Sequence, residues 1–478
     1  MSAPDVAVLR HLIGGEYVTG PTAVRCNPAT SGTVVAEYPV GDASTVRAAV
    51  EAASTAFPQW RDTPAPQRGA VLMAAAELLA QRAETVATDL CREEGKTLAE
   101  ARGEVHRAVA MLRYFGSEGW RIGGLQLPSA DPGVHLYTVR EPLGVVGLVT
   151  PWNFPIAIPT WKMAPALISG NTVVIKPAEL TPVSVAHLVE CLGEAGLPPG
   201  VVNVVYGRGR EAGEAIVNDP DVAAVSFTGS VSVGRRINQV VAARMGRVQL
   251  ELGGKNALVV GAGADLEEAA TLAADSAFGL TGQACTATSR VIVVGPGHDQ
   301  FVDLLARRAR QYRAGDGAQA GVSMGPVVSD GQLATDLDYL AIAQREGAAV
   351  VAGGTHEGRM LDATVLADVR PDARIAREEV FGPLLAVLRA DDLDEAIGLV
   401  NSTEFGLTAG LVTQDLTDAM TFSRRVEAGV IKINRKTTGT DLNAPFGGVK
   451  SSSNNLFREQ GPSATDFYTQ TKTVYLGV

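Results

Sequence analysis

Residues 145–176 read VVGLVTPWNFPIAIPTWKMAPALISGNTVVIK, which places a helical segment between two β-branched runs. Two more runs of this kind follow at 201–205 and 222–227. The starts of successive runs lie roughly two to three dozen residues apart, which is the length of a strand–helix–strand unit with parallel strands. This stretch therefore predicts a doubly wound parallel sheet, in which helices cover both faces.

A second series of short apolar runs follows, again separated by helical segments. We expect it to form a second sheet, because a chain of 478 residues exceeds the roughly 250 to 300 residues that one hydrophobic core can serve. The change between the two series falls near Gly253 and Gly254. The runs of the second series are 257–260, 290–294, 384–388, 407–412 and 430–433.

The first 120 residues are predicted to be helical after a short β segment at 11–17. Their clearest helix is 67–82, where apolar residues recur at helical spacing and charged residues such as Arg68 fall elsewhere. We expect this helix to pack on a sheet. Its predicted apolar face consists of Val71, Leu72, Ala75, Leu78 and Leu79.

The composition is typical of a globular α/β enzyme, with 46% hydrophobic and 19% charged residues. A net charge of −11 argues against binding nucleic acid or anionic lipid, since either needs dense positive charge. Residues 142–161 carry no charge and match a membrane span in length. Their four prolines would break a continuous helix, so we expect no membrane segment.

The cysteines and the opening residues indicate a cytoplasmic protein. Four cysteines lie far apart without a CxxC pair, which predicts neither a disulfide framework nor a zinc site. The opening MSAPDVAVLR lacks the basic and then apolar layout of a secretory signal. We therefore expect a reducing compartment and no metal ion.

Cys285 is the candidate nucleophile. It lies in LTGQACTATS, a run of small and polar residues that offers backbone N–H groups and room for a substrate. Because only the thiolate attacks, we expect a partly open, electropositive setting around it. The alternative is a buried cysteine that acts as a small hydrophobic residue, which is our interpretation of the other three, Cys26, Cys91 and Cys191.

Two polar residues are candidates for assisting this cysteine. Glu251 lies between two leucines just before a glycine pair, and partial burial there would raise its pKa toward that of a general base. Its alternative is a solvent-facing residue at a strand end. Asn153 follows the run 145–149, where open α/β sheets bind ligands, and its amide can donate to an oxyanion. Its alternative is a turn residue between prolines.

Signals for a nucleotide are individually weak. Gly229 and Ser230 follow a predicted strand and begin a helix, whose free N–H groups favour a phosphate. Lys176 ends another strand in KPAE, and the carboxylate of Glu179 can accept hydrogen bonds from a ribose. Gly209 belongs to GRGREAG, which misses the GxGxxG spacing by one residue.

Seven motifs, taken together, resemble the aldehyde dehydrogenase superfamily in identity and order: PWNFP, KPAE, FTGS, ELGGK, GQACTA, EEVFGP and PFGG. The resemblance spans almost the whole chain. It implies two doubly wound parallel-sheet domains with a β oligomerisation arm, and hence a homodimer or homotetramer. The implied parts are an NAD(P)-binding domain at 1–124 and 142–252, a catalytic domain at 253–447, and an arm at 125–141 and 448–478, whose strand we expect at 465–475.

The resemblance also implies the roles of site residues. Cys285 would be the nucleophile, Glu251 the general base, and Asn153 with the Cys285 N–H the oxyanion hole. The cofactor would be NAD or NADP, and the residues do not decide which, because relatives with KPAE accept either. The implied cofactor-binding residues are Thr150, Trp152, Lys176, Glu179, Gly209, Gly213, Gly229, Ser230, Glu379 and Phe381.

The C-terminal sequence, from INRKTTGTDLNAPFGGVK onward, looks like the 2-ketoglutarate semialdehyde dehydrogenase branch, although it departs at 453–456. An acidic aldehyde needs a cation at the pocket mouth, and an arginine fork matches a carboxylate or a phosphonate. Each such cation is equally compatible with a weak surface ion pair. The expected substrate-binding residues are Arg107 first, then Trp161, Ala284, Arg435 and Lys436.

Other functions stay open at this point. The substrate alternatives are succinate semialdehyde, a phosphonate aldehyde and an aromatic aldehyde. An alternative from another enzyme class is a thiol hydrolase that uses Cys285 without a nucleotide. A non-enzymatic alternative is a structural protein that keeps the fold. A CoA-acylating relative is less favoured, because Glu251 is present to activate water.

Overall fold

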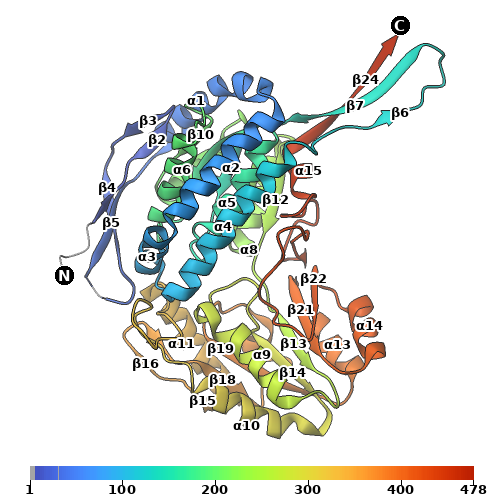
Figure 1. Ribbon diagram of the computed structural model, residues 1–478. Coiled ribbons are helices and arrows are strands. Elements are labelled where there is room, and N and C mark those ends of the chain that lie inside the picture. The colour runs from blue at the N-terminus through green and yellow to red at the C-terminus, as the bar shows by residue number, and fades with distance from the viewer. Residues whose placement is uncertain (1–5, 31, 478) are drawn as a thin grey trace.

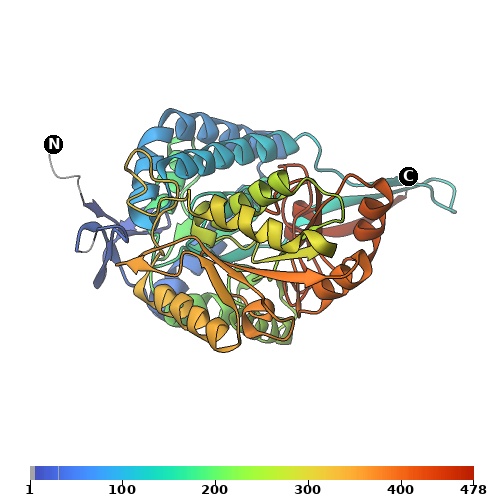
Figure 2. The ribbon, with the colours of Figure 1, turned by 90° about the horizontal axis from the view of Figure 1, so that it is seen from below.

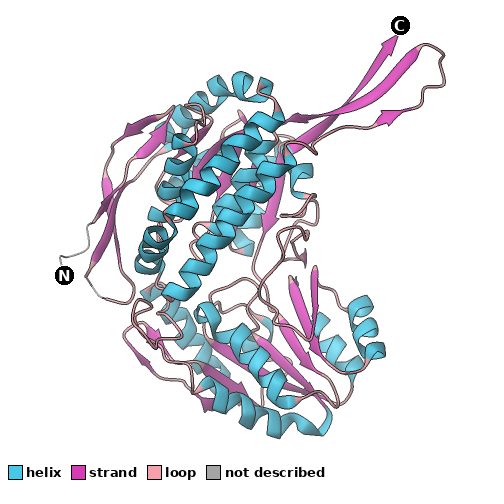
Figure 3. Cartoon of the chain, viewed as in Figure 1, coloured by secondary structure: helices cyan, strands magenta, loops and turns pink. Residues whose placement is uncertain are grey.

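The computed structural model describes residues 6–30 and 32–477, so part of the opening sequence used to judge a secretory signal lies outside the described residues. Two seven-stranded sheets each form the centre of one body of the molecule, and a three-stranded sheet projects from the upper body (Figure 1). Helices accompany both seven-stranded sheets (Figure 3). The predicted α/β class, with two doubly wound sheets and a β arm, is confirmed.

The first sheet contains all four runs predicted between residues 145 and 227. They form β8 to β11, which lie parallel to one another, and β12 continues the sheet beyond β11. A short hairpin adds two antiparallel strands at the other edge. In spatial order the strands are β12 (Arg247–Glu251), β11 (Val222–Thr228), β8 (Val145–Val149), β9 (Thr172–Lys176), β10 (Val202–Val204), β2 (His11–Ile13) and β3 (Glu16–Val18).

Both faces of the first sheet are covered, because successive strand side chains point to opposite sides. Val146 and Leu148 pack in one hydrophobic cluster with helices α2 to α6, whereas Val145 and Val149 pack in another with α1, α7 and α8. The helices are α1 (Ala43–Asp62), α2 (Ala65–Gln81), α3 (Ala83–Glu94), α4 (Leu98–Glu118), α5 (Ala157–Ile168), α6 (Val183–Glu194), α7 (Glu214–Asn218) and α8 (Val231–Ala243).

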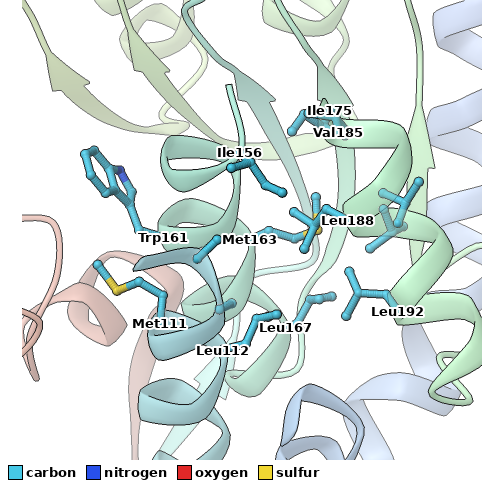
Figure 4. Close-up of a cluster of buried hydrophobic side chains, with 14 of the residues drawn as sticks. Met111, Leu112, Ile156, Trp161, Met163, Leu167, Ile175, Val185, Leu188 and Leu192 are labelled. Carbon is cyan, nitrogen blue, oxygen red and sulfur yellow. The ribbon is translucent and has the colours of Figure 1, made fainter. Parts of the chain in front are cut away.

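Helix α5 explains the uncharged stretch at 142–161. Every residue of α5 is buried, and Figure 4 shows Met163 and Leu167 between Met111 and Leu112 of α4 on one side and the side chains of α6 on the other. The stretch is thus a core strand followed by the start of a core helix. Within the described residues, no helix is long and apolar enough to cross a membrane.

The second sheet contains all five runs of the second series. They form β13, β14, β19, β21 and β22, and all are parallel. Two strands that the sequence did not reveal complete one edge, where β15 runs antiparallel to β18. In order the strands are β15 (Ala349–Ala352), β18 (Thr364–Ala367), β19 (Leu384–Ala390), β14 (Arg290–Val294), β13 (Ala257–Val260), β21 (Thr408–Val412) and β22 (Val430–Ile433).

The second sheet is also covered on both faces. Figure 2, seen from below, shows its strands between two groups of helices. Leu258 and Val260 of β13 face a cluster with α9 and α10, whereas Ala257 and Val259 face one with α11, α13 and α14. The helices are α9 (Leu266–Phe278), α10 (His298–Ala309), α11 (Asp330–Arg345), α12 (Arg374–Arg377), α13 (Leu393–Asn401) and α14 (Leu416–Arg425).

Two expectations for the N-terminal region were wrong. The β region is longer than 11–17, because further strands precede and follow it in the sequence. These strands form a separate sheet of β1 (Ala7–Val8), β5 (Val34–Pro39) and β4 (Thr22–Cys26). Helix α2 packs on α4, α5 and α6 rather than directly on a sheet. Arg68 is buried there, because its guanidinium donates to the carbonyls of Ile168 (3.0 Å) and Arg61 (3.2 Å) at the ends of two helices.

The arm consists of β6 (Gln126–Leu127), β7 (Val134–Pro142) and β24 (Thr469–Gly477), with β24 antiparallel to β7 over its whole length. Its predicted strand starts later than residue 465, because α15 (Ala464–Tyr468) precedes it and is anchored in the core. Residues 449–468 lie on the body instead: β23 (Val449–Lys450) pairs with β20 (Phe405–Gly406). The division of the chain into three functional parts stays a prediction.

Asn171 joins the arm to the first sheet and provides a test of this packing. Its side chain accepts from the N–H groups of Leu143 (2.7 Å) and Gly144 (3.2 Å) and donates to the carbonyl of Tyr468 (2.9 Å). We expect Asn171→Ala to cost about 2–4 kcal/mol, because it leaves buried backbone groups without partners. The measurement is the apparent unfolding temperature by calorimetry. The exposed Asn218→Ala is the control, and equal unfolding temperatures for the two variants would contradict the assignment.

Candidate active site

A pocket of about 280 Å³ opens where β8, β11 and β12 end. Open α/β sheets bind ligands at the carboxyl ends of their strands, and here three neighbouring parallel strands end together. The opposite wall comes from the second body. The pocket brings together seven of the predicted site residues, namely Trp152, Asn153, Gly229, Ser230, Cys285, Glu379 and Phe381.

Asn153 is buried in the loop that follows β8, and two contacts hold it in place. Its side-chain amide donates to the carbonyl of Gln283 at 3.0 Å, which joins this loop to the one that carries Cys285. Its own carbonyl accepts from the Lys96 ammonium at 2.7 Å. The amide is therefore oriented next to the nucleophile candidate, as an oxyanion donor must be.

Cys285 is only partly buried and lines the pocket, as expected of a nucleophile. The expected electropositive setting was wrong. Burial raises the pKa of the Cys285 thiol to about 12, and nearby carboxylates, Glu251 foremost, act in the same direction. The loop itself is held by Asn256, whose amide donates to the carbonyls of Cys285 (2.7 Å) and Ala287 (2.8 Å).

Glu251 is the last residue of β12, and its side chain is buried rather than facing solvent. Neither carboxylate oxygen has a hydrogen-bond partner among the described residues. Burial raises the pKa of Glu251 well above its usual value, and the negative charge of Glu459 adds to the effect. A Cβ at Gly447 would lie 2.6 Å from one of these oxygens, so the glycine of PFGG makes room for the carboxylate.

A buried ion pair accompanies Glu251, and the sequence did not reveal it. The Lys162 ammonium of α5 donates to Glu459 and, at 2.8 Å, to the hydroxyl of Ser226 on β11. Both charged side chains are at most 2% exposed. Lysine and glutamate are rarely buried this deeply without a partner. The two residues lie far apart in the sequence, so only the folded structure shows that they form a pair.

Four of the predicted nucleotide residues, Lys176, Glu179, Gly209 and Gly213, lie at the end of β9 and on two loops that meet beyond it. The buried Lys176 ammonium donates to the carbonyls of Pro177 (2.8 Å) and Gly207 (3.2 Å), and burial lowers its pKa to about 8. The Glu179 carboxylate accepts from the Gly209 N–H at 2.9 Å. A Cβ at Gly213 would reach the Lys176 side chain at 3.6 Å.

The nearby Thr150 donates its N–H to the carbonyl of Lys176 at 3.2 Å. Its hydroxyl is buried without a hydrogen-bond partner among the described residues. Thr150 follows β8 and thus lies beside the KPAE loop, which follows the neighbouring strand β9.

The wall formed by the second body carries the residues of EEVFGP. Trp152 meets the Phe381 ring edge to face at 5.5 Å, and Phe381 has a φ of +68°, which a side chain rarely adopts. The Glu379 carboxylate accepts from the Gly254 N–H at 2.9 Å, and burial raises its pKa. A Cβ at Gly253 would lie 2.0 Å from this carboxylate, which explains the glycine pair of ELGGK.

The predicted substrate residues do not gather in this pocket. Arg107 of α4 donates to the Thr440 hydroxyl (2.7 Å) and to the Gln460 side chain (2.8 Å), and so joins α4 to the C-terminal loops. Trp161 is buried and its ring lies 6.1 Å from that of Phe446.

The other three lie elsewhere. Ala284 is buried beside Cys285, in a smaller cavity of about 20 Å³. Arg435 and Lys436 are exposed, and the Lys436 ammonium is 3.9 Å from Asp275, which is a surface pair.

Gln332 lines the pocket and was missed. It donates to the carbonyl of Val380 at 2.8 Å and to the buried Asp336 at 2.9 Å, so it supports the Phe381 loop from α11. Its neighbours in the sequence form an ordinary helix start and give no sign that Gln332 is a site residue. Among the described residues, no three His, Cys, Asp or Glu side chains lie so that they would hold a metal ion.

Known proteins resemble this chain in sequence and in structure. The aldehyde dehydrogenase family matches residues 18–474. A 2,5-dioxopentanoate dehydrogenase of Saccharolobus solfataricus is 49% identical over 96% of this chain and 97% of its own. An alpha-ketoglutarate semialdehyde dehydrogenase of Haloferax volcanii is 46% identical over 98% of each chain. An NAD-dependent aldehyde dehydrogenase from Sinorhizobium meliloti has a similar crystal structure, with a TM-score of 0.96 and 36% identity over 99% of this chain and 97% of that one.

The raised pKa of the Cys285 thiol has a measurable consequence. Below the pKa the thiolate fraction grows about tenfold per pH unit, so iodoacetamide labelling of Cys285 without added nucleotide should keep rising from pH 7 to 10. The rate is read by mass spectrometry of the Cys285 peptide. A short peptide with blocked ends and a single cysteine is the control and should level off about one unit above pH 8.5. A Cys285 rate that levels off below pH 9 would contradict the prediction.

Proposed function

The chain belongs to the aldehyde dehydrogenase family, and from this we propose that it oxidises a small acidic semialdehyde to the carboxylic acid with NAD or NADP, through a thioester on Cys285. One observation carries the proposal. Cys285 and the oriented Asn153 amide share one pocket, and the carboxylate of Glu251 is buried beside them. A nucleophile, an oxyanion donor and a base of raised pKa are the three groups that this reaction needs.

The residues present fit a dinucleotide. Lys176 donates to the Gly207 carbonyl and Glu179 accepts from the Gly209 N–H, so both side chains lie at the same pair of loops and can hold a ribose. The start of α8 at Ser230 offers N–H groups to a phosphate. Glu379 and Phe381 form the wall on which the nicotinamide end would rest. When bound, the oxidised nicotinamide supplies a positive charge beside the thiol and accepts a hydride.

The chain's own residues then act in two stages. The Cys285 thiolate adds to the aldehyde carbon, and the second N–H of the Asn153 amide, with the Cys285 N–H, stabilises the oxygen that becomes negative. Loss of the hydride from that carbon leaves a thioester. Glu251 takes a proton from water, the hydroxide attacks the thioester, and the acid leaves as the thiolate is restored.

The two rival activities are less well supported. A nucleotide-independent thiol hydrolase has no use for the cluster around Lys176 and Glu179, which lies beyond β9 rather than beside Cys285. A CoA-acylating enzyme has no use for a base that activates water, whereas the space beside Glu251 is kept open by Gly447. Oxidation followed by hydrolysis uses both features.

The substrate is proposed from the relatives and from charge. The names 2,5-dioxopentanoate and alpha-ketoglutarate semialdehyde, carried by the two relatives, describe one compound with a carboxylate at the end opposite the aldehyde. Arg107 is the proposed partner of that carboxylate. Its guanidinium has five N–H donors. Three hydrogen bonds to Thr440 and Gln460 occupy some of them and leave others for a substrate. The choice between NAD and NADP is left to Glu179, which favours NAD when it faces the ribose.

The arm is proposed to join two or more copies of the chain in a homodimer or homotetramer. It projects from the body, and β24 ends the sheet with a row of backbone groups that another chain can pair or cover (Figure 1). A reducing cytoplasm is the proposed location, consistent with four unpaired cysteines.

Two variants test the chemistry. Cys285→Ala should abolish aldehyde-dependent NAD(P)H formation. Glu251→Gln should still form one equivalent of NAD(P)H in a burst but hydrolyse the thioester roughly 100-fold more slowly or worse, because general-base catalysis contributes about that much. Intact-mass spectrometry of Glu251→Gln should then find the acyl group on Cys285. Undiminished NAD(P)H formation by Cys285→Ala would refute the proposal.

A panel of acidic, aliphatic and aromatic aldehydes tests the substrate class. We expect Arg107→Ala to raise KM roughly tenfold or more for acidic semialdehydes alone, since one charged hydrogen bond is worth about 1.5–3 kcal/mol. Arg113→Ala is the matched control, because Arg113 lies on the same helix and forms an exposed pair with Glu77. An equal rise in KM for neutral aldehydes would remove Arg107 from substrate recognition.

A further inference from the structure

The first turns of α4 contact both loops that carry the proposed chemistry. In Figure 1 the N-terminal end of α4 points down toward the second body. The helix is closed there by a capping box between Thr97 and Glu100, and Leu98 donates its N–H to the carbonyl of Gly317 in the second body at 2.9 Å. The helix start is therefore fixed to both bodies.

Lys96, just before this helix, holds the loop of Asn153. Its ammonium is 1% exposed and donates to the carbonyl of Asn153 at 2.7 Å and to the Glu104 carboxylate at 2.7 Å. It also lies 4.7 Å from the centre of the Phe154 ring, within reach of a cation–π contact. One buried cation thus contacts two consecutive residues of the PWNFP loop.

Glu104 holds the other end of the same loop. One of its oxygens accepts from the N–H groups of Ile156 and Ala157, both at 3.0 Å. These are the first N–H groups of α5, whose N-cap residue Ile156 has an apolar side chain that accepts nothing. The Glu104 carboxylate of α4 therefore provides the cap of α5. The positive end of the α5 dipole stabilises the negative charge of this carboxylate.

The Cys285 loop is held from the same helix. Glu100 accepts from the N–H of Leu280 at 2.7 Å with one oxygen, while its other oxygen accepts from Thr97. Leu280 and Thr281 both have positive φ values, +55° and +57°, so the strained start of this loop is held by a side chain of α4.

We propose that Lys96 and Glu104 are positioning residues of the oxyanion hole, which hold the loop 153–157 from both ends so that the Asn153 amide points at the oxygen on the carbon attacked by Cys285. The inference rests on the proposed function. Neither residue is among those that line the pocket, so each acts through Asn153 rather than on a substrate. The Lys96 ammonium lies near two buried carboxylates, Glu104 at 2.7 Å and Glu94 at 3.9 Å, so removing the cation alone would leave buried negative charge without a partner.

The size of the effect follows from the geometry of catalysis. Removing an oxyanion donor costs about 100- to 1,000-fold in rate, and a shift of about 1 Å costs about 100-fold. A loosened loop should thus lower the rate of the hydride step roughly 10- to 100-fold.

The variant Lys96→Met/Glu104→Gln removes both charges of this pair, and the Gln oxygen can still accept a hydrogen bond. Glu94 loses its ion-pair partner but keeps the hydrogen bond from the backbone N–H of residue 96. The matched control is Arg102→Met/Glu84→Gln, which removes an exposed pair between α4 and α3. The readouts are the single-turnover rate of NAD(P)H formation and the amide hydrogen exchange of residues 153–157. We expect slower turnover and faster exchange in the first variant, and neither change in the control.

The same substitutions are then made in a chain that also carries Asn153→Ala. This comparison separates an effect on the position of Asn153 from a general loss of stability. If the pair acts through Asn153, its removal should change the turnover rate less than about threefold once the amide is gone. An equal loss in both backgrounds, or no loss with Asn153 present, would overturn the proposal. Should the double variant not fold, Lys96→Arg keeps the charge but displaces the carbonyl contact, and the same comparison applies to it.

The exchange measurement keeps this inference separate from the proposed function. If the native chain forms no NAD(P)H from any aldehyde, the proposed function fails. Exchange at Ile156 and Ala157 still reports whether Lys96 and Glu104 hold the loop, and unchanged exchange in the double variant overturns the inference by itself.

Discussion

The parallel pairing of β8 with β11 and of β11 with β12 sets the positions of the groups at the pocket, because it makes three strands end at one edge. Asn153 follows the first strand, Gly229 the second, and Glu251 ends the third. Backbone hydrogen bonds in register place Glu251 and the strand end before Gly229, whereas Asn153 lies in a loop and also depends on its contacts with Lys96 and Gln283. The second body then needs to supply only Cys285 and the wall at Phe381.

Buried charge is the main cost of this arrangement. Glu251 lies without hydrogen-bond partners among the described residues, and two buried ion pairs surround the site, Lys162 with Glu459 and Lys96 with Glu104. Replacing such pairs by apolar residues often stabilises a protein, so their presence at a site is better explained by orientation and by pKa control than by stability. The raised pKa of Glu251 follows directly from the same burial.

The parallel strands were predictable because β-branched runs recurring at the length of a βαβ unit allow few other arrangements. The strands β12, β15 and β18 were missed, since a run of four or five residues is too short for periodicity to distinguish a strand from a piece of helix or loop. Helix α2 was predicted to pack on a sheet, but an apolar helix face does not specify what covers it. Arg68 shows the same limit, because one of its partners is the carbonyl of Ile168, which lies 100 positions away in α5.

The sequence by itself determined the α/β class, the order of the strands along the chain and the chemical types at the site, since residue identity and local spacing carry that information. The charge around Cys285, the burial of Glu251 and the contacts of Lys96 were decided only by the tertiary structure. The physical reason is that a pKa, a desolvation cost or a hydrogen bond between residues 57 positions apart depends on distances through space, and periodicity along the chain does not encode them.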